Sequence, residues 1–243
     1  MKKLILLFAV AGVLLFSDSC GVNVLKGEGK KGTVSRSVGT FNAIDVAISS
    51  DVKVTVADGA IPRVELVGYE NVMKHIKTEV KDGILHITFD LDDTWQIDDE
   101  DVEVVVTVPS LSAFSLSGSP DAEIYGNLKG AEFKLDVSGA SSVMIDNINT
   151  EKLLVDMSGA SELNIKGGAV KIANYDISGA GKIEAFPLQT EETNASFSGA
   201  AEGEVSVSKK LDAGISGAGS IKYKGTPEVV KHISGVGSVT PEE

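Results

Sequence analysis

Seven serines, each followed directly by a glycine, are the first residues in this sequence whose type suggests chemistry. They are Ser117, Ser138, Ser158, Ser178, Ser198, Ser216 and Ser234. The chain around Ser216 falls one residue short of the G-x-S-x-G motif of a serine nucleophile, because Ala218 replaces the last glycine. That motif also needs a strand-to-helix turn, and seven copies cannot all be catalytic. We therefore interpret the serines as structural corners whose hydroxyls hydrogen bond to neighbouring corners.

Three aspartates stand two residues before three of these serines, at Asp136, Asp156 and Asp176. Some proteins with the parallel β-helix fold, which we predict below for this chain, cleave acidic polysaccharides. One hypothesis is therefore a carbohydrate-active enzyme with these aspartates as its catalytic residues. Carboxylate oxygens also suit calcium, which makes the same three residues calcium candidates. The simpler interpretation, which we favour, is that the side chains turn toward water. A further alternative is that Lys134 or Lys152 leans across them.

A second acidic cluster surrounds the only tryptophan, Trp95, in residues 90–101. The calcium candidates within it are Asp92, Asp93, Asp98 and Asp99. The segment lacks the glycine and the closing glutamate of an EF-hand loop. Because runs of charge usually stay in water, we interpret it as a solvated acidic loop and predict no bound metal or other cofactor.

The single cysteine, Cys20, follows a segment typical of exported proteins. Two lysines precede an apolar run over residues 4–16, which is too short for a membrane-spanning helix. The small residues before Cys20 resemble a bacterial lipobox, from which Asp18 departs. We predict a lipoprotein signal peptide over residues 1–19 and a lipid on the cysteine sulfur. The alternative is an ordinary signal peptide with a free cysteine.

The Ser-Gly pairs recur along the chain at steps of 21, 20, 20, 20, 18 and 18 residues. Apolar residues mostly stand one, three and five positions before each serine, and again five and seven positions after it. This period of two predicts a strand on each side of every Ser-Gly corner, followed by a looser return segment. The glycine supplies a backbone geometry at the corner that a β-carbon would obstruct.

A unit of about 20 residues with two strands cannot bury its own apolar face, so copies must stack to form a core. We therefore predict an all-β fold, a right-handed parallel β-helix (a solenoid) with rungs of 18–21 residues. The inward-facing residues include Val137, Met157, Ile177 and Phe197. Leucine-rich repeats need a consensus that is absent here, and propeller blades need about twice the period.

The rest of the chain predicts the domain organisation. Residues 20–40 are rich in glycine and basic residues, which is typical of a flexible tether behind the lipidated cysteine. Residues 41–243 form one predicted β-solenoid domain, with an N-terminal cap and degenerate first rungs over 41–110 and regular repeats over 111–243. Within the cap, Asp82-Gly83 predicts a hairpin, and residues 69–74 predict a short helix.

Three stretches resemble a known family. They are FNAIDV at residues 41–46, PSL at 109–111 leading into LSGS at 116–119, and the repeated Ser-Gly-Ala corners. On these residues the chain resembles the putative auto-transporter adhesin, head GIN domain family, from about Phe41 to the C-terminus. The resemblance implies a β-helical fold, a cell-envelope location and no established catalytic residues. "Adhesin" is the family's label, and the sequence itself does not show adhesion.

Composition narrows the function further. The net charge of −13 argues against a nucleic-acid partner, which needs a basic footprint. The rungs vary by only three residues in length, which leaves no long loops to wall a substrate cleft. An acidic face would also repel uronate polymers. Both observations count against the enzyme hypothesis.

We therefore predict a structural or adhesive binding module of the cell envelope with no catalytic activity. We expect it to contact the membrane through its lipid anchor and to bind a glycan or a protein as its ligand. The expected location is the outer membrane of a Gram-negative bacterium, facing the periplasm or the surface. A periplasmic partner-binding protein is the third hypothesis.

Overall fold

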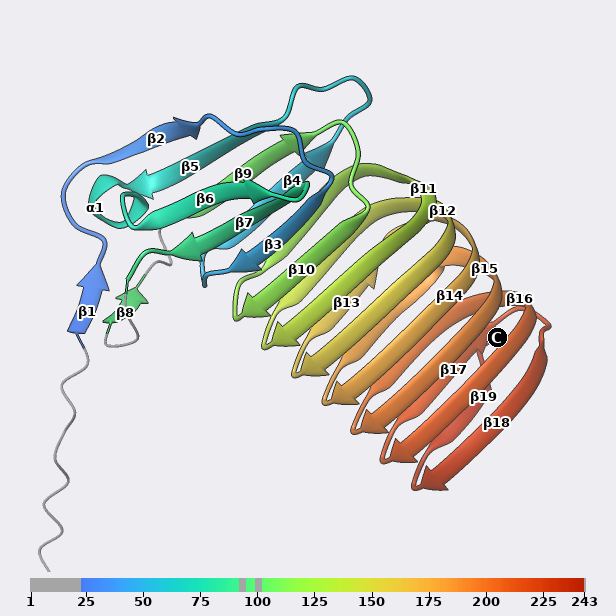
Figure 1. The fold of residues 1–243 in the computed structure, drawn as a ribbon. Coiled ribbons are helices and arrows are strands. Elements are labelled where there is room, and N and C mark those ends of the chain that lie inside the picture. The colour runs from blue at the N-terminus through green and yellow to red at the C-terminus, as the bar shows by residue number, and fades with distance from the viewer. Residues whose placement is uncertain (1–22, 92–94, 99–101, 243) are drawn as a thin grey trace, which may run out of the picture.

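A computed structural model describes residues 23–91, 95–98 and 102–242 of the chain. The fold is nearly all β and forms a parallel β-solenoid of about six turns, with an irregular region at its N-terminal end (Figure 1). This confirms the predicted solenoid. Nowhere in the described ranges is there a helix long and apolar enough to cross a membrane.

The regular stack is built from ten strands. They are β10 (Ala113–Gly118), β11 (Ala122–Gly139), β12 (Ser142–Gly159), β13 (Glu162–Ile165), β14 (Gly168–Gly179), β15 (Lys182–Gly199), β16 (Glu202–Gly217), β17 (Ser220–Lys224), β18 (Glu228–Gly235) and β19 (Ser238–Pro241). Each serine of the seven corners pairs in parallel register with the serine of the next rung, from Ser117 to Ser234. The rungs therefore stack as the repeat predicts.

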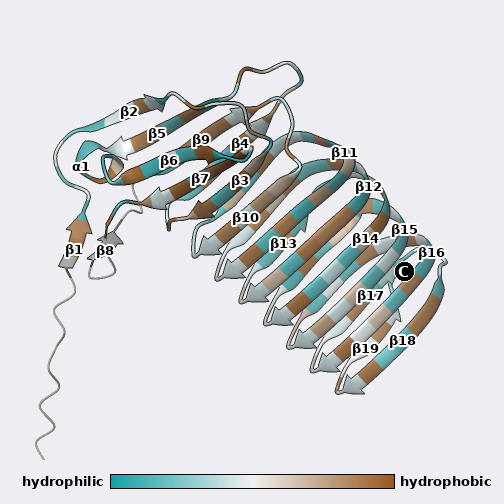
Figure 2. Ribbon diagram, in the orientation of Figure 1, coloured by the Kyte–Doolittle hydropathy of each residue, from teal (hydrophilic) through white to brown (hydrophobic). Residues whose placement is uncertain are grey.

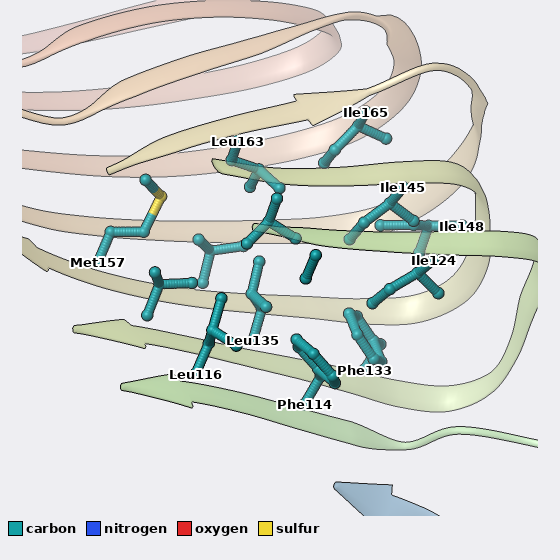
Figure 3. Close-up of a cluster of buried hydrophobic side chains, with 14 of the residues drawn as sticks. Phe114, Leu116, Ile124, Phe133, Leu135, Ile145, Ile148, Met157, Leu163 and Ile165 are labelled. Atoms are coloured by element: carbon teal, nitrogen blue, oxygen red, sulfur yellow. The ribbon is translucent and has the colours of Figure 1, made fainter. Parts of the chain in front are cut away.

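The core lies inside the stack and follows the predicted alternation. Val137, Met157, Ile177 and Phe197 point inward, and each exposes 3% of its surface or less. Phe114, Phe133 and Ile145 come from different rungs and meet in the same interior (Figure 3). Along the strands of the stack, apolar and polar residues alternate in short bands (Figure 2). Since the inward columns are mainly apolar, burial of this continuous core is the main stabilising term.

The corner glycines are required by close contact between rungs. Gly159 has a φ of +94°, and a β-carbon there would lie 2.2 Å from the carbonyl oxygen of Gly139. Gly179 and Gly199 meet the preceding rung in the same way, each at 2.4 Å. Only a residue without a β-carbon allows the chain to turn this tightly against its neighbour.

The return segments differ from the prediction of looser chain. Strands β11, β12 and β15 each run for 18 residues without a break, so the return segment stays extended. The backbone pairs rung to rung there too, as Leu128 does with Ile148. The physical reason is that both residues are buried, which requires their backbone polar groups to be paired.

The N-terminal region contains nine strands and one helix. They are β1 (Asn23–Lys26), β2 (Lys31–Arg36), β3 (Ala43–Ala47), β4 (Asp51–Val56), β5 (Arg63–Tyr69), α1 (Glu70–Met73), β6 (Ile76–Lys81), β7 (Ile84–Phe89), β8 (Trp95–Asp98) and β9 (Glu103–Val108). Strands β3 and β4 pair in parallel with β10 and β11, which confirms the predicted degenerate rung. A further rung, β7 and β9, lies on the other side of it, so the first rung in sequence is the second in space.

Antiparallel strands close this end of the stack. Strand β6 pairs with β7 through the predicted hairpin, where Asp82 has a φ of 53° and Gly83 a φ of 79°. Strand β5 pairs with β9, and β2 pairs with β5. The short helix is also confirmed as α1. The antiparallel strands and α1 therefore form the cap that a solenoid needs.

The prediction of a flexible tether over residues 20–40 is wrong for residues 23–26 and 31–36, which form strands. Residues 31–36 form β2, because Val34 and Val38 pack against the core and the backbone finds a partner in β5. Residues 23–26 form β1, which pairs in parallel with β8. The acidic segment around Trp95 therefore contains a strand, which the prediction of a solvated loop did not include.

Candidate binding face

An open groove of about 430 Å³ runs along the strands that lead into the corners. We call it the Asp–Ser groove, and its lining consists of Asp45, Ser115, Leu116, Ser117, Asp136, Val137, Ser138, Asp156, Met157, Ser158, Asp176 and Ser178. Alternation along each strand places its aspartates and serines on the outer side and the apolar residues between them inside. The groove is therefore a polar surface laid directly on the core.

The register brings the predicted aspartates together. Asp136 pairs with Asp156, and Asp156 pairs with Asp176, in one outward column. Asp45 extends this column through Ser115, which lies between Asp45 and Asp136. Sequence reasoning missed Asp45, because its strand lacks the Ser-Gly anchor; the signal was the same apolar–Asp–apolar pattern that surrounds Asp136.

One lysine and one histidine contact this column. The ammonium of Lys134 lies 2.9 Å from the carboxylate of Asp136, which confirms the predicted contact, and this hydrogen bond raises the pKa of Lys134. The imidazole Nδ1 of His86 lies 2.9 Å from the carboxylate of Asp45. The other predicted candidate, Lys152, pairs instead with Glu132. The two contacted aspartates, Asp45 and Asp136, lie toward the cap.

Asp156 and Asp176 form no ion pair within the described part of the chain. Partial burial raises the pKa of Asp156, and the negative charges of Asp136 and Asp176 raise it further, against an opposing effect of Lys134. A hydrogen bond with Asp136 also raises the pKa of Asp156. The middle of the groove therefore carries like charges that neighbouring cations do not balance.

The predicted ladder of hydrogen-bonded serine hydroxyls is wrong. Only Ser117 makes a side-chain hydrogen bond to the described residues, donating to the carbonyl oxygen of Val46 at 3.2 Å. Corner serines such as Ser158 are exposed and stack about 4.8 Å apart, which is beyond hydrogen-bond reach for side chains with parallel directions. The glycine fixes the corner, and the serine hydroxyls face solvent as free donors and acceptors.

A second hollow of about 440 Å³ continues the groove across the same strands. It shares Asp156 and Asp176 with the first and adds Asn174 and Asn194. The side-chain Nδ2 of Asn194 donates to Oδ1 of Asn174 at 2.8 Å, so the amides form a ladder along the stack. Carboxylates, amides and hydroxyls thus repeat at rung spacing over a continuous surface.

The return segments present a different outer surface, which we call the return face. Its charged residues alternate in sign along the stack, and oppositely charged neighbours form ion pairs. The pairs are Lys152–Glu132 at 3.3 Å, Lys171–Glu151 at 2.8 Å and Lys209–Glu191 at 2.6 Å. The charges of this surface are therefore balanced between neighbouring rungs.

The structure gives no support to the calcium hypothesis. Among the residues it describes, no three histidine, cysteine or acidic side chains are arranged to hold a metal ion, and this includes the column of Asp136, Asp156 and Asp176. Asp92, Asp93 and Asp99 lie outside the described residues, as do Cys20 and the signal peptide, and for Asp98 only the backbone in β8 is described. No histidine lines the Asp–Ser groove, so its serines have no neighbouring imidazole base there.

The fold and this surface define a capped β-solenoid with a repeating polar face. The chain belongs to the family described as putative auto-transporter adhesin, head GIN domain, whose profile matches residues 40–227. The family and the structures similar to this chain support a non-catalytic adhesive or binding module. No curated protein matches the sequence.

The solved structures similar to this chain include the following three. A putative adhesin from Bacteroides fragilis is 26% identical with a TM-score of 0.83, covering 90% of this chain and 100% of its own. A putative adhesin from Parabacteroides merdae is 24% identical with a TM-score of 0.72, covering 91% and 100%. A putative lipid binding protein from Parabacteroides distasonis is 22% identical with a TM-score of 0.72, also covering 91% and 100%.

Proposed function

We propose that this protein is a lipid-anchored binding module of the bacterial cell envelope that holds its ligand in the Asp–Ser groove. The observation that carries the proposal is the in-register column of aspartates beside free serine hydroxyls. Aligned like charges destabilise a sheet, yet Asp156 and Asp176 keep theirs without a counter-ion among the described residues. A surface on which these like charges repel one another is suited to an external partner that supplies hydrogen-bond donors.

The chemistry favours a hydroxyl-rich, non-acidic polymer such as a neutral glycan. Carboxylates accept hydrogen bonds from hydroxyls, and the serine and asparagine side chains both donate and accept. The groups repeat at about 4.8 Å, which suits a ligand with a regular repeat of its own. Uronate polymers would be repelled, since no basic residue lines the groove.

A glycan array probed with the purified protein tests this proposal. We expect specific binding of neutral glycans without change in the glycan. Release of shorter products, detected by mass spectrometry, would support the carbohydrate-active enzyme hypothesis with Asp136, Asp156 and Asp176. Absence of binding to every glycan would contradict the glycan ligand and favour the periplasmic partner-binding hypothesis.

The lipid anchor and the outer-membrane location are tested separately at Cys20. The small residues before the only cysteine support a lipidated N-terminus. We expect the full-length protein in the membrane fraction and labelled by a fatty-acid probe, and Cys20→Ser in the soluble fraction without label. Equal fractionation of the two proteins would contradict the anchor and leave the binding face untouched.

A further inference from the structure

A polar hollow of about 480 Å³ lies in the cap, where the end of β2 meets the start of β6. Three cationic side chains line it, from Arg36, Lys74 and Lys77. Ser35, Ser37 and Thr78 also line it with hydroxyls, of which that of Ser35 donates its proton to Glu65 at 3.3 Å. It is the opposite of the Asp–Ser groove in charge, although it belongs to a chain of net charge −13.

The arginine is held in place and keeps an unused donor. An Nη2 proton of Arg36 is donated to the carbonyl oxygen of Met73 at 2.9 Å, and the same nitrogen lies 3.3 Å from the carbonyl oxygen of Ile76. These contacts fix the guanidinium between β2, the end of α1 and the start of β6. Its Nε is buried and has no hydrogen-bond partner among the described residues. A bound anion beside the guanidinium would balance its positive charge through charge-assisted hydrogen bonds.

The lysines add positive charge that the surroundings balance only in part. Lys74 forms no ion pair with any residue that the structure describes. Lys77 lies 3.2 Å from Glu79, and both side chains of that pair are more than half exposed, so water screens it strongly. Asp90 is the only acidic side chain in the lining. Three cations against one carboxylate leave the hollow positive.

We propose that this cap hollow binds a phosphate group, either free phosphate or the phosphate of a lipid headgroup. A guanidinium, two ammonium groups and hydroxyl donors around one open hollow are the donors by which proteins hold phosphate oxygens. The hollow is large enough for one such group with its water.

The headgroup source rests on the lipid anchor of the proposed function. Cys20 precedes β1 by three residues, and three extended residues span about 10 Å. Strand β1 lies at the cap end of the molecule (Figure 1). A lipid on Cys20 would therefore hold the cap close to the bilayer. An anionic bilayer would repel the acidic body of the stack, so a local positive hollow would turn the cap toward the surface.

The test uses the full mature chain made without lipid, as Cys20→Ser, in two assays. Inorganic phosphate is titrated by calorimetry, and sedimentation is measured with vesicles of phosphatidylcholine containing one-fifth phosphatidylglycerol against pure phosphatidylcholine. The variant is Lys74→Gln with Lys77→Gln, which spares the arginine that supports the cap. Its matched control is Lys209→Gln with Lys222→Gln, two exposed lysines of the stack.

We expect binding in at least one assay, weakened about tenfold in the Lys74/Lys77 variant and unchanged in the control. Binding of phosphate in solution identifies free phosphate as a ligand, and binding of anionic vesicles alone identifies the headgroup; both support the site. Absence of binding in both assays, or equal binding by variant and control, would overturn it. Because the protein carries no lipid, a failed anchor at Cys20 leaves this result unaffected.

Discussion

The Asp–Ser groove and the return face lie on the same rungs and treat charge in opposite ways. On the return face, Glu151 and Lys171 meet at 2.8 Å, and Lys209 meets Glu191 at 2.6 Å in the rungs beyond. In the groove, Asp156 stands between Asp136 and Asp176 with no cation of its own. One face alternates charge along the stack, and the other repeats it.

The difference shows what an in-register stack does to an outward side chain. Each outward column places equivalent residues about 4.8 Å apart, so a favourable or unfavourable pair recurs at every rung. Alternating charges add small stabilising contributions, and like charges add small destabilising ones. Oppositely charged neighbours can neutralise an outward column, as they do on the return face. Among the described residues, Asp156 and Asp176 in the groove have no such neighbour.

The largest expected effect comes from breaking the corner that holds the groove in register. Gly159→Ala would place a β-carbon 2.2 Å from a backbone oxygen at a φ of +94°. We expect a loss of about 2–4 kcal/mol in the free energy of unfolding, measured by urea denaturation. Gly214→Ala is the matched control, because its nearest backbone atom is 3.8 Å away. Equal losses in the two variants would contradict the role of the corner.

The next effect comes from exchanging the charge patterns of the two faces. Asp156→Lys places a cation between Asp136 and Asp176, and we expect a gain of a few tenths of a kcal/mol. Lys171→Glu places like charges beside Glu151 and Glu191, and we expect a lower Tm. Both shifts should shrink in 1 M NaCl, which screens surface charges. Stability changes of the same sign for the two variants would contradict the opposite charge patterns of the two faces.

The smallest expected effect is an opposite pH dependence of the two faces. The folded pKa of Asp156 is raised, so the fold takes up that proton before the unfolded chain does. Stability therefore rises as pH falls from 7 through the raised pKa, and this gain is complete below the unfolded value of about 3.9. The hydrogen bond from Lys171 lowers the pKa of Glu151, so its contribution is present above about 4.3 and is lost as pH falls further.

Tm measured against pH for Asp156→Asn and Glu151→Gln separates the two contributions. Relative to wild type, we expect Asp156→Asn to gain stability at neutral pH and to lose that advantage in acid. We expect Glu151→Gln to lose stability at neutral pH and to match wild type in acid. Parallel curves for the two variants would show that neither carboxylate behaves as the structure indicates.

The stack could be predicted from the sequence because its information is local and repeated. The alternation around Met157 identifies its inward side, and the recurring Ser-Gly pairs, 18 to 21 residues apart, identify the register. The column of Asp136, Asp156 and Asp176 follows from these two facts. The absence of hydrogen bonds between the described corner serines could not be predicted from the sequence, since it depends on the distance between rungs and on side-chain direction.

The cap could not be predicted in the same way, because its pairings join segments far apart in the sequence. Nothing in residues 31–36 shows that β2 pairs with β5, and nothing in the sequence shows that β7 and β9 lie outside β3 and β4. The cap hollow combines residues from 35–37, 74–78 and position 90, which tertiary contacts such as that of Arg36 with the carbonyl oxygen of Ile76 bring together. Because the cap has no sequence repeat, the sequence does not indicate which of its strands pair or in which register.

The most direct test of the binding face is calorimetric titration of a neutral glycan found on the array into three proteins. They are the wild type, the groove variant with Asp136→Asn, Asp156→Asn and Asp176→Asn, and the return-face variant with Lys152→Gln, Lys171→Gln and Lys209→Gln. We predict an affinity at least tenfold weaker for the groove variant, with a Tm equal to or above that of wild type, and wild-type affinity for the return-face variant. Equal affinity of the groove variant and the wild type would contradict binding in the Asp–Ser groove.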